Sequence, residues 1–457
     1  MNSQPTRSSR LYERALRVMP GGVSRNTVLR RPHPFYAAGG AGCYVTDVEG
    51  VRRIDFANNM ASLIHGHAHP AIVEAVTRQL ERGSAFTFAT EAEVLFAEHM
   101  CGRSASFERI RFVNSGTEAV MCCLKAARAF TGRPKIAKVE GAYHGLYDYA
   151  EVSQSAGPAN WGEAAHPRSN PVAQGTPAAV LHDVVVLPFN DPDAALAILD
   201  AHKTELACVL VDPLPHRVGL MPASKAFVAA LRRWTCKTRA LLVFDEVITF
   251  RCEHGGAQEW FDEDLRPDLT ALGKMIGGGL PVGAIAGRAE VMDVLNPLAD
   301  EVLFPHSGTF SANPLTMTAG LAAMQLFDRD AVARLNRLGD YARRQIADAI
   351  RTAGIDACVT GAGSIFRIHL AAPEPPRNYR EGYVDAARKQ LVAAMLDHLF
   401  DNGVMLINTC SGTLSTPMSE REIDVLCGAL LSGFRKLKSQ RPAAPPSRLQ
   451  HERAGAR

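Results

Sequence analysis

Short runs of apolar residues alternate with amphipathic stretches through the middle of this chain. The runs are bounded by glycine and proline and have the length of β-strands, and the stretches between them repeat apolar residues at helical spacing. The runs that fit strands span 110–113, 184–189, 207–211 and 240–247. Helical patterns span 194–202 and 224–234. Continuous apolar strands that alternate with helices are typical of a mostly parallel sheet with both faces covered, which predicts an α/β domain here.

The pattern changes near Asp328, where long amphipathic stretches replace the alternation of strands and helices. Helices are predicted over 331–352 and 383–402, and strands over 364–370 and 404–407. This mixture predicts a smaller α+β domain after the large one. The expected parts are an N-terminal segment that joins the small domain, the large domain, the small domain and a disordered tail, over 1–60, 61–327, 328–437 and 438–457.

Two segments lack periodicity. Residues 155–177 are rich in Gly, Pro, Asn and Ala, and this is long for a connection without secondary structure. The segment is either a lid over a site or a passive surface loop. Residues 438–457 are rich in Pro and Arg and have almost no large apolar side chain, so we expect disorder there.

Composition and charge narrow the function classes. The 457 residues are 47% hydrophobic and 21% charged, and the net charge is +3. Because no block of Lys and Arg is interleaved with aromatics, small molecules are expected as partners and nucleic acid is not. The N-terminus lacks the apolar core of a signal peptide, and no apolar run approaches the roughly 20 residues that span a bilayer, so we expect a cytoplasmic protein without membrane contact. The cysteines lack metal-site spacing, and no metal is expected.

A polar turn joins an apolar strand to a helix at 111–119. Ser115, Gly116 and Thr117 precede the helix predicted over 118–130. The free N–H groups of a helix start, with two hydroxyls beside them, can bind a phosphate. Ser and Thr are also common as ordinary helix caps, so this segment alone leaves both interpretations open.

A lysine among glycines and a carboxylate at a strand end give that turn a chemical context. Lys274 has a glycine beside it and a glycine run shortly after, so little bulk keeps a flat ligand away. Such a lysine can form an imine, and Asp245, near the end of an apolar run, can hold the ring nitrogen of the same ligand. Tyr143 beside His144 adds an aromatic side chain. Together these residues suggest pyridoxal phosphate (PLP).

The chain resembles the class III aminotransferases of fold type I, in the branch that contains glutamate-1-semialdehyde aminomutase and the β-amino-acid aminotransferases. The likeness covers about residues 8 to 436 and rests on motifs that occur in order along the chain. The motifs span 20–23, 66–70, 114–119, 140–145, 243–247, 272–281 and 306–310. The resemblance implies a large domain with a mostly parallel central sheet, a smaller α+β domain, and PLP as the cofactor.

By position, the resemblance assigns the residues around the cofactor ring. Lys274 would carry the cofactor as an imine, and Asp245 would pair with the ring nitrogen. Tyr143 and Val247 would lie on opposite faces of the ring, with His144 next to Tyr143. Lys274 and Asp245 are therefore the expected catalytic residues.

The resemblance also assigns the phosphate site and an assembly. Ser115, Gly116 and Thr117 would hold the phosphate. Thr309 would reach the phosphate of the neighbouring subunit, which implies a homodimer whose active sites are built from both chains.

Departures from the family pattern bear on the substrate. Arg25 matches an arginine that binds substrate carboxylate in the β-amino-acid aminotransferases, but a second arginine of that group falls near Thr409 and is missing. Arg217 stands where relatives carry a small or amide residue, and its guanidinium is a planar fork that matches a carboxylate. Arg25 and Arg217 are therefore the expected substrate-binding residues. The alternative for Arg217 is a surface salt bridge, and Arg367 is then the next candidate.

Three functions fit these residues. The first is an aminotransferase that moves an amino group from an amino acid or amine, β-amino acids included, to a 2-oxo acid such as 2-oxoglutarate or pyruvate. The second is an intramolecular aminomutase or epimerase resembling glutamate-1-semialdehyde 2,1-aminomutase, in which a Trp stands at Met60 and a Phe-Glu pair lies in the segment 407–413. Neither feature is present, which favours the first function. The third, a cofactor-binding protein without turnover, is disfavoured by the retained Lys274 and Asp245.

Overall fold

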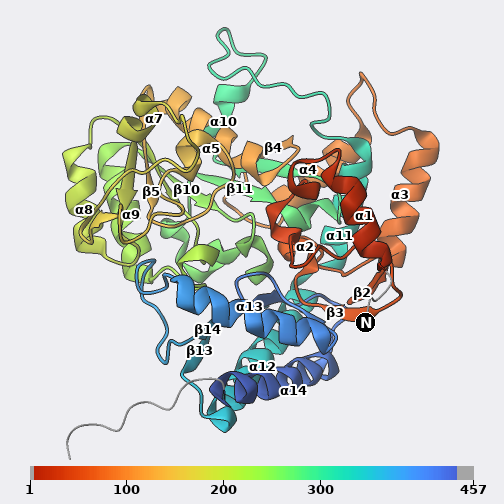
Figure 1. Ribbon diagram of the computed structural model, residues 1–457. Coiled ribbons are helices and arrows are strands. Elements are labelled where there is room, and N and C mark those ends of the chain that lie inside the picture. The colour runs from red at the N-terminus through yellow and green to blue at the C-terminus, as the bar shows by residue number, and fades with distance from the viewer. Residues whose placement is uncertain (1–4, 440–457) are drawn as a thin grey trace, which may run out of the picture.

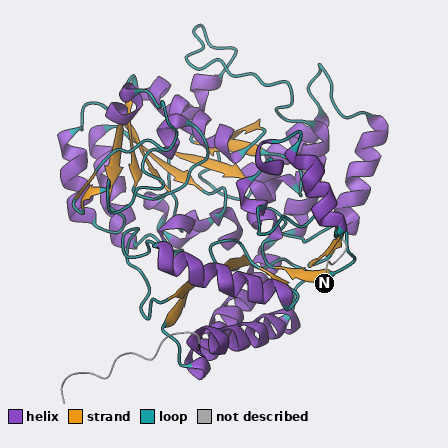
Figure 2. Cartoon of the chain, in the orientation of Figure 1, coloured by secondary structure: helices purple, strands orange, loops and turns teal. Residues whose placement is uncertain are grey.

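The large domain is built on a seven-stranded sheet with the order β4-β12-β11-β10-β9-β5-β8 (Figure 1, Figure 2). The structure is a computed structural model that describes residues 5–439. The strands are β4 (Arg109–Val113), β5 (Lys135–Val139), β8 (Val184–Leu187), β9 (Leu206–Val211), β10 (Leu241–Asp245), β11 (Leu269–Gly273) and β12 (Gly283–Gly287). Every residue of these strands except in β4 is buried, which is why they are continuous apolar runs in the sequence.

The sheet is parallel apart from β12, which runs antiparallel to both of its neighbours, β11 and β4. The predicted α/β fold with a mostly parallel central sheet is therefore confirmed. β12 itself was not among the predicted strands. Its sequence, Gly-Ala-Ile-Ala-Gly, carries one large apolar side chain, so it gives little strand signal.

Helices cover both faces of the sheet. On β5, Ile136 belongs to the apolar cluster that contains α5 (Gly116–Thr131), whereas Ala137 belongs to the cluster that contains α8 (Pro192–Ala201) and α9 (Lys225–Thr238). Successive strand residues point to opposite faces, so α5 lies on one face and α8 and α9 lie on the other. The helices predicted over 194–202 and 224–234 are α8 and α9. The remaining helices of this half are α3 (Pro70–Arg82), α4 (Glu91–Cys101), α6 (Asp148–Glu151), α7 (Ala178–Asp183), α10 (Ala289–Met292) and α11 (Pro314–Leu326).

The C-terminal part forms a second group of helices and short strands, below the large sheet in Figure 1. Its elements are α12 (Arg329–Ala353), β13 (Ala357–Thr360), β14 (Ile365–Leu370), α13 (Ala386–Asp401), β15 (Val404–Met405), β16 (Ser411–Thr413) and α14 (Glu420–Ser439). α13 begins later than predicted because Asp385 caps it, accepting the N–H of Arg388. α14 continues to Ser439, so the first two residues of the predicted tail are helical, and residues 440–457 lie outside the described part.

The N-terminal segment shares a sheet with the C-terminal part. The segment contains α1 (Arg7–Leu16), β1 (Ala37–Ala41), β2 (Tyr44–Asp47), β3 (Arg52–Asp55) and α2 (Asn58–Ala61). β3 pairs in parallel with β15, within a sheet of order β1-β2-β3-β15. The domain boundaries drawn from the sequence stay a prediction.

The aperiodic segment 155–177 is held by a loop of the C-terminal part. It contains a two-stranded hairpin of β6 (Gly162–Glu163) and β7 (His166–Pro167). Tyr379 donates its hydroxyl to the carbonyl of Ala156 at 2.6 Å. Arg380 donates to the carbonyls of residues 161–163. Within residues 5–439, we find no helix with the length and apolar character needed to cross a membrane.

Candidate active site

The segments that carry the predicted cofactor residues end at one edge of the large sheet. Asp245 is the last residue of β10, and Lys274 directly follows β11, whose Ala271 pairs with Asp245 in parallel register. β4 runs in the same direction as β11, since both are antiparallel to β12, and it ends at Val113, just before Ser115 and α5. Ligands of such sheets bind at the carboxyl ends of the strands. The fold thus brings these three segments together.

Asp245 is held by two hydrogen-bond donors. His144 Nδ1 lies 2.7 Å from Asp245 Oδ2, and the backbone N–H of Val247 donates to Oδ1 at 3.0 Å. His144 and Asp245 are 2% and 5% exposed. Burial lowers the pKa of His144 although Asp245 opposes the shift, so the imidazole is neutral and donates its Nδ1 proton. The second ring nitrogen of His144 is buried without a hydrogen-bond partner in the described part of the chain.

Lys274 has a strained backbone beside two carboxylates. Its φ of 48° lies in the left-handed region, which costs a non-glycine residue about 1–3 kcal/mol. Burial lowers the pKa of Lys274, and attraction to Asp245 and Asp212 offsets only part of that shift. A lysine with a lowered pKa offers more of the neutral amine, the form that attacks a carbonyl group and accepts a proton.

Asp212 is a second buried carboxylate next to Asp245. It follows β9, whose Val211 pairs with Phe244 of β10, so the two aspartates leave adjacent strand ends. Asp212 Oδ1 accepts the N–H of Leu214 at 2.8 Å. Burial, followed by the charge of Asp245, raises the pKa of Asp212 well above its usual value. Two close carboxylates do not both ionise readily, and Asp245 accepts two hydrogen bonds where Asp212 accepts one.

The start of α5 forms a cradle without bulk. Ser115 caps the helix, because its Oγ accepts the N–H of Glu118 at 3.1 Å. The N–H groups of Gly116 and Thr117 lie in the first turn, which has no intrahelical acceptors. A Cβ on Gly116 would stand 2.9 Å from Cγ1 of Val247, so only glycine lets the helix start approach Val247 this closely. The cradle fits a phosphate at α5 with a flat ring beside it.

Tyr143 and Arg217 lie against each other. The guanidinium carbon of Arg217 is 4.7 Å from the centre of the Tyr143 ring, and Tyr143 is 38% exposed. Arg217 Nη1 donates to the carbonyl of Gln154 at 3.2 Å. Burial lowers the pKa of Arg217. Within residues 5–439 the guanidinium of Arg217 forms this one hydrogen bond and no ion pair.

Arg25 and Thr309 contact other parts of the chain. Arg25 is exposed, and its Nη1 donates to Oδ1 of Asn59 at 2.7 Å. Asn59 belongs to α2, all of whose residues have positive φ, so α2 is a left-handed turn. Thr309 is exposed on the loop between α10 and α11. In the described part of the chain, no hydrogen bond or ion pair links Arg25 or Thr309 to the residues around Asp245.

His216 and Lys138 were missed by sequence reasoning. His216 Nε2 lies 3.1 Å from Thr409 Oγ1, and Arg367 donates to the His216 carbonyl at 2.8 Å. Lys138 is buried in β5 and donates to two backbone carbonyls, at 2.6 and 3.0 Å, in the loops that follow β5. Burial lowers the pKa of Lys138 to about 7. Lys138 could have been noticed in the sequence because it is a charged residue within a short apolar run. No comparable sequence feature distinguishes His216.

Comparison with protein families and curated proteins gives a consistent result. Residues 28–418 match the family model for class III aminotransferases. Among curated proteins, the chain is 38% identical over 403 residues to a glutamate-1-semialdehyde 2,1-aminomutase of Methanothermobacter thermautotrophicus. That alignment covers 88% of this chain and 91% of the relative.

Solved structures of transaminases have the same fold. An omega-transaminase from Sphaerobacter thermophilus is 45% identical, with a TM-score of 0.92 over 95% of this chain and 99% of that one. A transaminase solved with PLP bound is 41% identical, with a TM-score of 0.87 over 94% and 98%. A β-phenylalanine aminotransferase from Variovorax paradoxus is 33% identical, with a TM-score of 0.84 over 95% of each chain.

Proposed function

This chain belongs to the class III aminotransferase family, and we propose that it moves an amino group from an amino acid or amine, β-amino acids included, to a 2-oxo acid such as 2-oxoglutarate or pyruvate. As a member of the family it is an enzyme that uses PLP. The observation that carries the proposal is the cluster of Lys274, Asp245 and His144 at the carboxyl ends of β10 and β11. When bound, PLP supplies an electron sink for the bond broken at the substrate carbon that bears the amine.

In this proposal, Asp245 holds the ring nitrogen in its protonated form, which requires a charged carboxylate. The two hydrogen bonds from His144 and Val247 support that charge, and they also fix the direction of the carboxylate. Tyr143 would cover one face of the cofactor ring and Val247 the other. The start of α5 would hold the phosphate.

The phosphate is bound by the N–H groups and hydroxyls of Ser115, Gly116 and Thr117 in this proposal. The N-terminus of a helix as long as α5 favours an anion, and no side-chain bulk occupies the approach at Gly116. Thr309 of the partner subunit would complete the phosphate site.

Lys274 would hold the cofactor and would also move the proton. Its neutral amine would take the proton from the substrate carbon that bears the amine. The lowered pKa of Lys274 supports this role, because a neutral amine is needed at the start of the step.

Substrate carboxylate recognition is assigned to Arg25 and Arg217. Arg217 lies over Tyr143, next to the proposed ring position, and within residues 5–439 its other donors have no partner. Arg25 is exposed at the edge of the N-terminal segment, so it has to turn away from Asn59 to meet a substrate. Mutation of Arg217 to Met should therefore raise KM for an amino acid far more than for a simple amine.

A homodimer with shared active sites is part of the proposal. Loops 83–90 and 293–313 expose large apolar side chains, at Phe88 87% and at Leu298 90%. Beside the first loop lies a groove of about 620 Å³ lined by α3, α4 and α11. Figure 1 shows the loop after α10 projecting from the body of the chain. Exposed apolar side chains on projecting loops are typical of interfaces between subunits.

The cytoplasmic location stays a prediction.

A spectral titration with a single amino donor tests transfer against isomerisation. The curated relatives named as aminomutases support the second candidate, an intramolecular aminomutase or epimerase. A transferase should release one oxo acid per active site without an acceptor and stop in its aminated form, and an added 2-oxo acid should restart it. Continuous conversion of donor to an isomer without any acceptor would contradict transfer. Lys274→Ala serves as the inactive control.

A further inference from the structure

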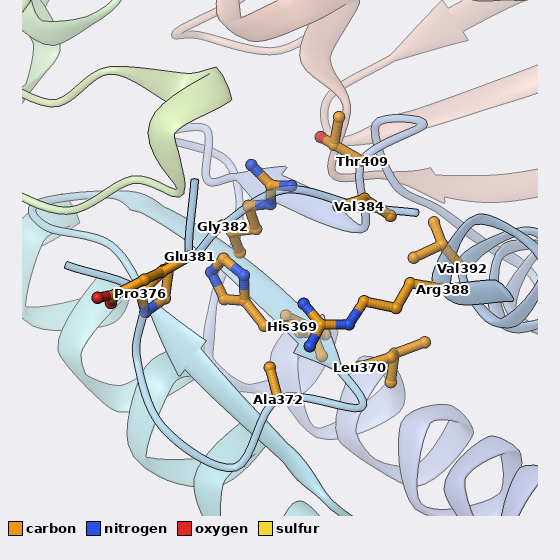
Figure 3. A pocket seen from close by; sticks show the side chains of 12 residues that line it. His369, Leu370, Ala372, Pro376, Glu381, Gly382, Val384, Arg388, Val392 and Thr409 are labelled. Carbon is orange, nitrogen blue, oxygen red and sulfur yellow. The ribbon is translucent and has the colours of Figure 1, made fainter. Parts of the chain in front are cut away.

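A small cavity lies between β14, α13 and the loop that joins them (Figure 3). Its lining includes Arg367 and His369 of β14, Arg388 of α13, and Thr409. About 20 Å³ of it is open to the centre of a water-sized sphere. A cavity needs roughly 10–15 Å³ by this measure to hold one water, so the space suits one small ion or one or two waters.

Arg367 brings a buried positive charge to this cavity. Its side chain is 5% exposed, and its Nη1 donates to the carbonyl of His216 at 2.8 Å. Its Nε is buried without a hydrogen-bond partner in the described part of the chain. Burial lowers the pKa of Arg367 to about 10, which still leaves the guanidinium charged at neutral pH.

Arg388 adds a second positive charge from the other side. In the described part of the chain, its Nη1 makes a single, long hydrogen bond of 3.4 Å to the carbonyl of Tyr383. Within residues 5–439 neither Arg388 nor Arg367 forms an ion pair. Glu381 also lines the cavity, but its carboxylate binds Arg377 and points away from the other lining side chains in Figure 3.

His369, which also lines the cavity, carries no charge there. Burial and the charges of Arg367 and Arg388 lower the pKa of His369 to about 3, so its ring is neutral. Its Nε2 contacts Thr360 Oγ1 at 2.9 Å. The buried Arg367 and the half-buried Arg388 therefore line one small cavity, and neither has an ion-pair partner within residues 5–439. An unpaired buried charge such as that of Arg367 is costly.

We propose that this cavity binds one small monovalent anion of halide size, held between Arg367 and Arg388. A water molecule could satisfy the free Nε of Arg367 but not the two charges. The bound anion fixes Arg367, which in turn holds the carbonyl of His216, and His216 contacts Thr409. The anion site requires no particular substrate or acceptor, and Arg367 is also the second candidate for binding a substrate carboxylate.

Bromide in crystals of the holoenzyme tests the site directly, because its anomalous scattering distinguishes it from water. A bromide peak between the two guanidinium groups is expected. The holoenzyme should also melt about 1–3 °C higher in sodium chloride than in a bulky sulfonate salt of equal ionic strength. Arg388→Met should abolish that difference. Arg377→Met, which removes an exposed arginine of the same loop, should keep it.

A water molecule found in place of bromide would overturn the proposal. An Arg388→Met variant whose melting temperature differs between the two salts as much as that of the wild type would overturn it too. Arg388 is only half-buried, so its variant should fold even where the buried Arg367→Met does not. The source of the anion follows from kinetics. If chloride raises KM in competition with a carboxylate substrate, the substrate carboxylate shares the site, and if KM does not change, the site is for a free ion.

Discussion

Loss of Arg380 should weaken the hold on the segment 155–177. Arg380 donates to both carboxylate oxygens of Glu140, each at 3.0 Å, and to the backbone carbonyls of residues 161–163 at 2.8–3.0 Å. Glu140 is 4% exposed and directly precedes the loop that carries Tyr143. Mutation of Arg380 to Met removes all of these donors and keeps a side chain of similar reach.

The magnitude follows from what the mutation leaves behind. A buried ion pair contributes little net stability, but removal of one partner typically costs about 3–5 kcal/mol because the other charge stays buried. Burial already raises the pKa of Glu140, although Arg380 opposes the shift. Without Arg380 that pKa should rise further. The loss of stability is then complete at pH values above the new pKa of Glu140. It becomes smaller as the pH falls through that pKa, because Glu140 takes up a proton and loses its charge.

Thermal unfolding of the holoenzyme at pH 8 and pH 5.5, with limited proteolysis of segment 155–177, measures this effect. Arg380→Met should melt well below the wild type at pH 8, recover part of the difference at pH 5.5, and be cleaved faster in that segment. The double variant with Glu140→Gln should be more stable than Arg380→Met alone.

Arg377→Met is the matched control, because Arg377 is exposed and pairs with Glu381 at the surface, where such pairs contribute about 0–1 kcal/mol. An equal loss in Arg377→Met, or a loss in Arg380→Met that does not depend on pH, would refute the reasoning.

Three further predictions concern the active site and its support. Borohydride reduction of the holoenzyme should fix the cofactor on Lys274, and peptide mapping that finds another labelled lysine would disprove the assignment. Asp245→Asn should slow turnover roughly 100-fold or more while the fold is kept, as circular dichroism would show, and near wild-type turnover would exclude the role. Burial lowers the pKa of Lys138 from 10.5 to about 7. Its buried charge therefore destabilises the folded state fully below pH 7 and less as the pH rises. Between pH 7 and pH 9 the melting temperature of the wild type should therefore rise relative to that of Lys138→Met. A difference between the two melting temperatures that stays constant over this range would contradict the prediction.

Local chemistry was enough to propose the candidate cofactor residues from the sequence. Lys274 stands among glycines, Asp245 ends a buried strand, and Ser115 to Thr117 join a strand to a helix. Each requirement of a flat, phosphorylated ligand leaves a mark within a few residues of sequence, because strand ends and helix starts are local structures. The parallel sheet was predictable for the same reason, since strands buried on both faces are continuous apolar runs.

Only the tertiary structure decided how these groups support one another. The contact of His144 with Asp245 joins residues 101 positions apart, and the bonds of Arg380 to Glu140 join residues 240 apart. Such partners meet because of strand order and chain crossing, and neither leaves a periodic pattern in the sequence. The antiparallel β12, the burial of Lys138 and the arginines beside Thr409, which have no ion pair within residues 5–439, depend in the same way on burial and distance, which only the folded chain defines.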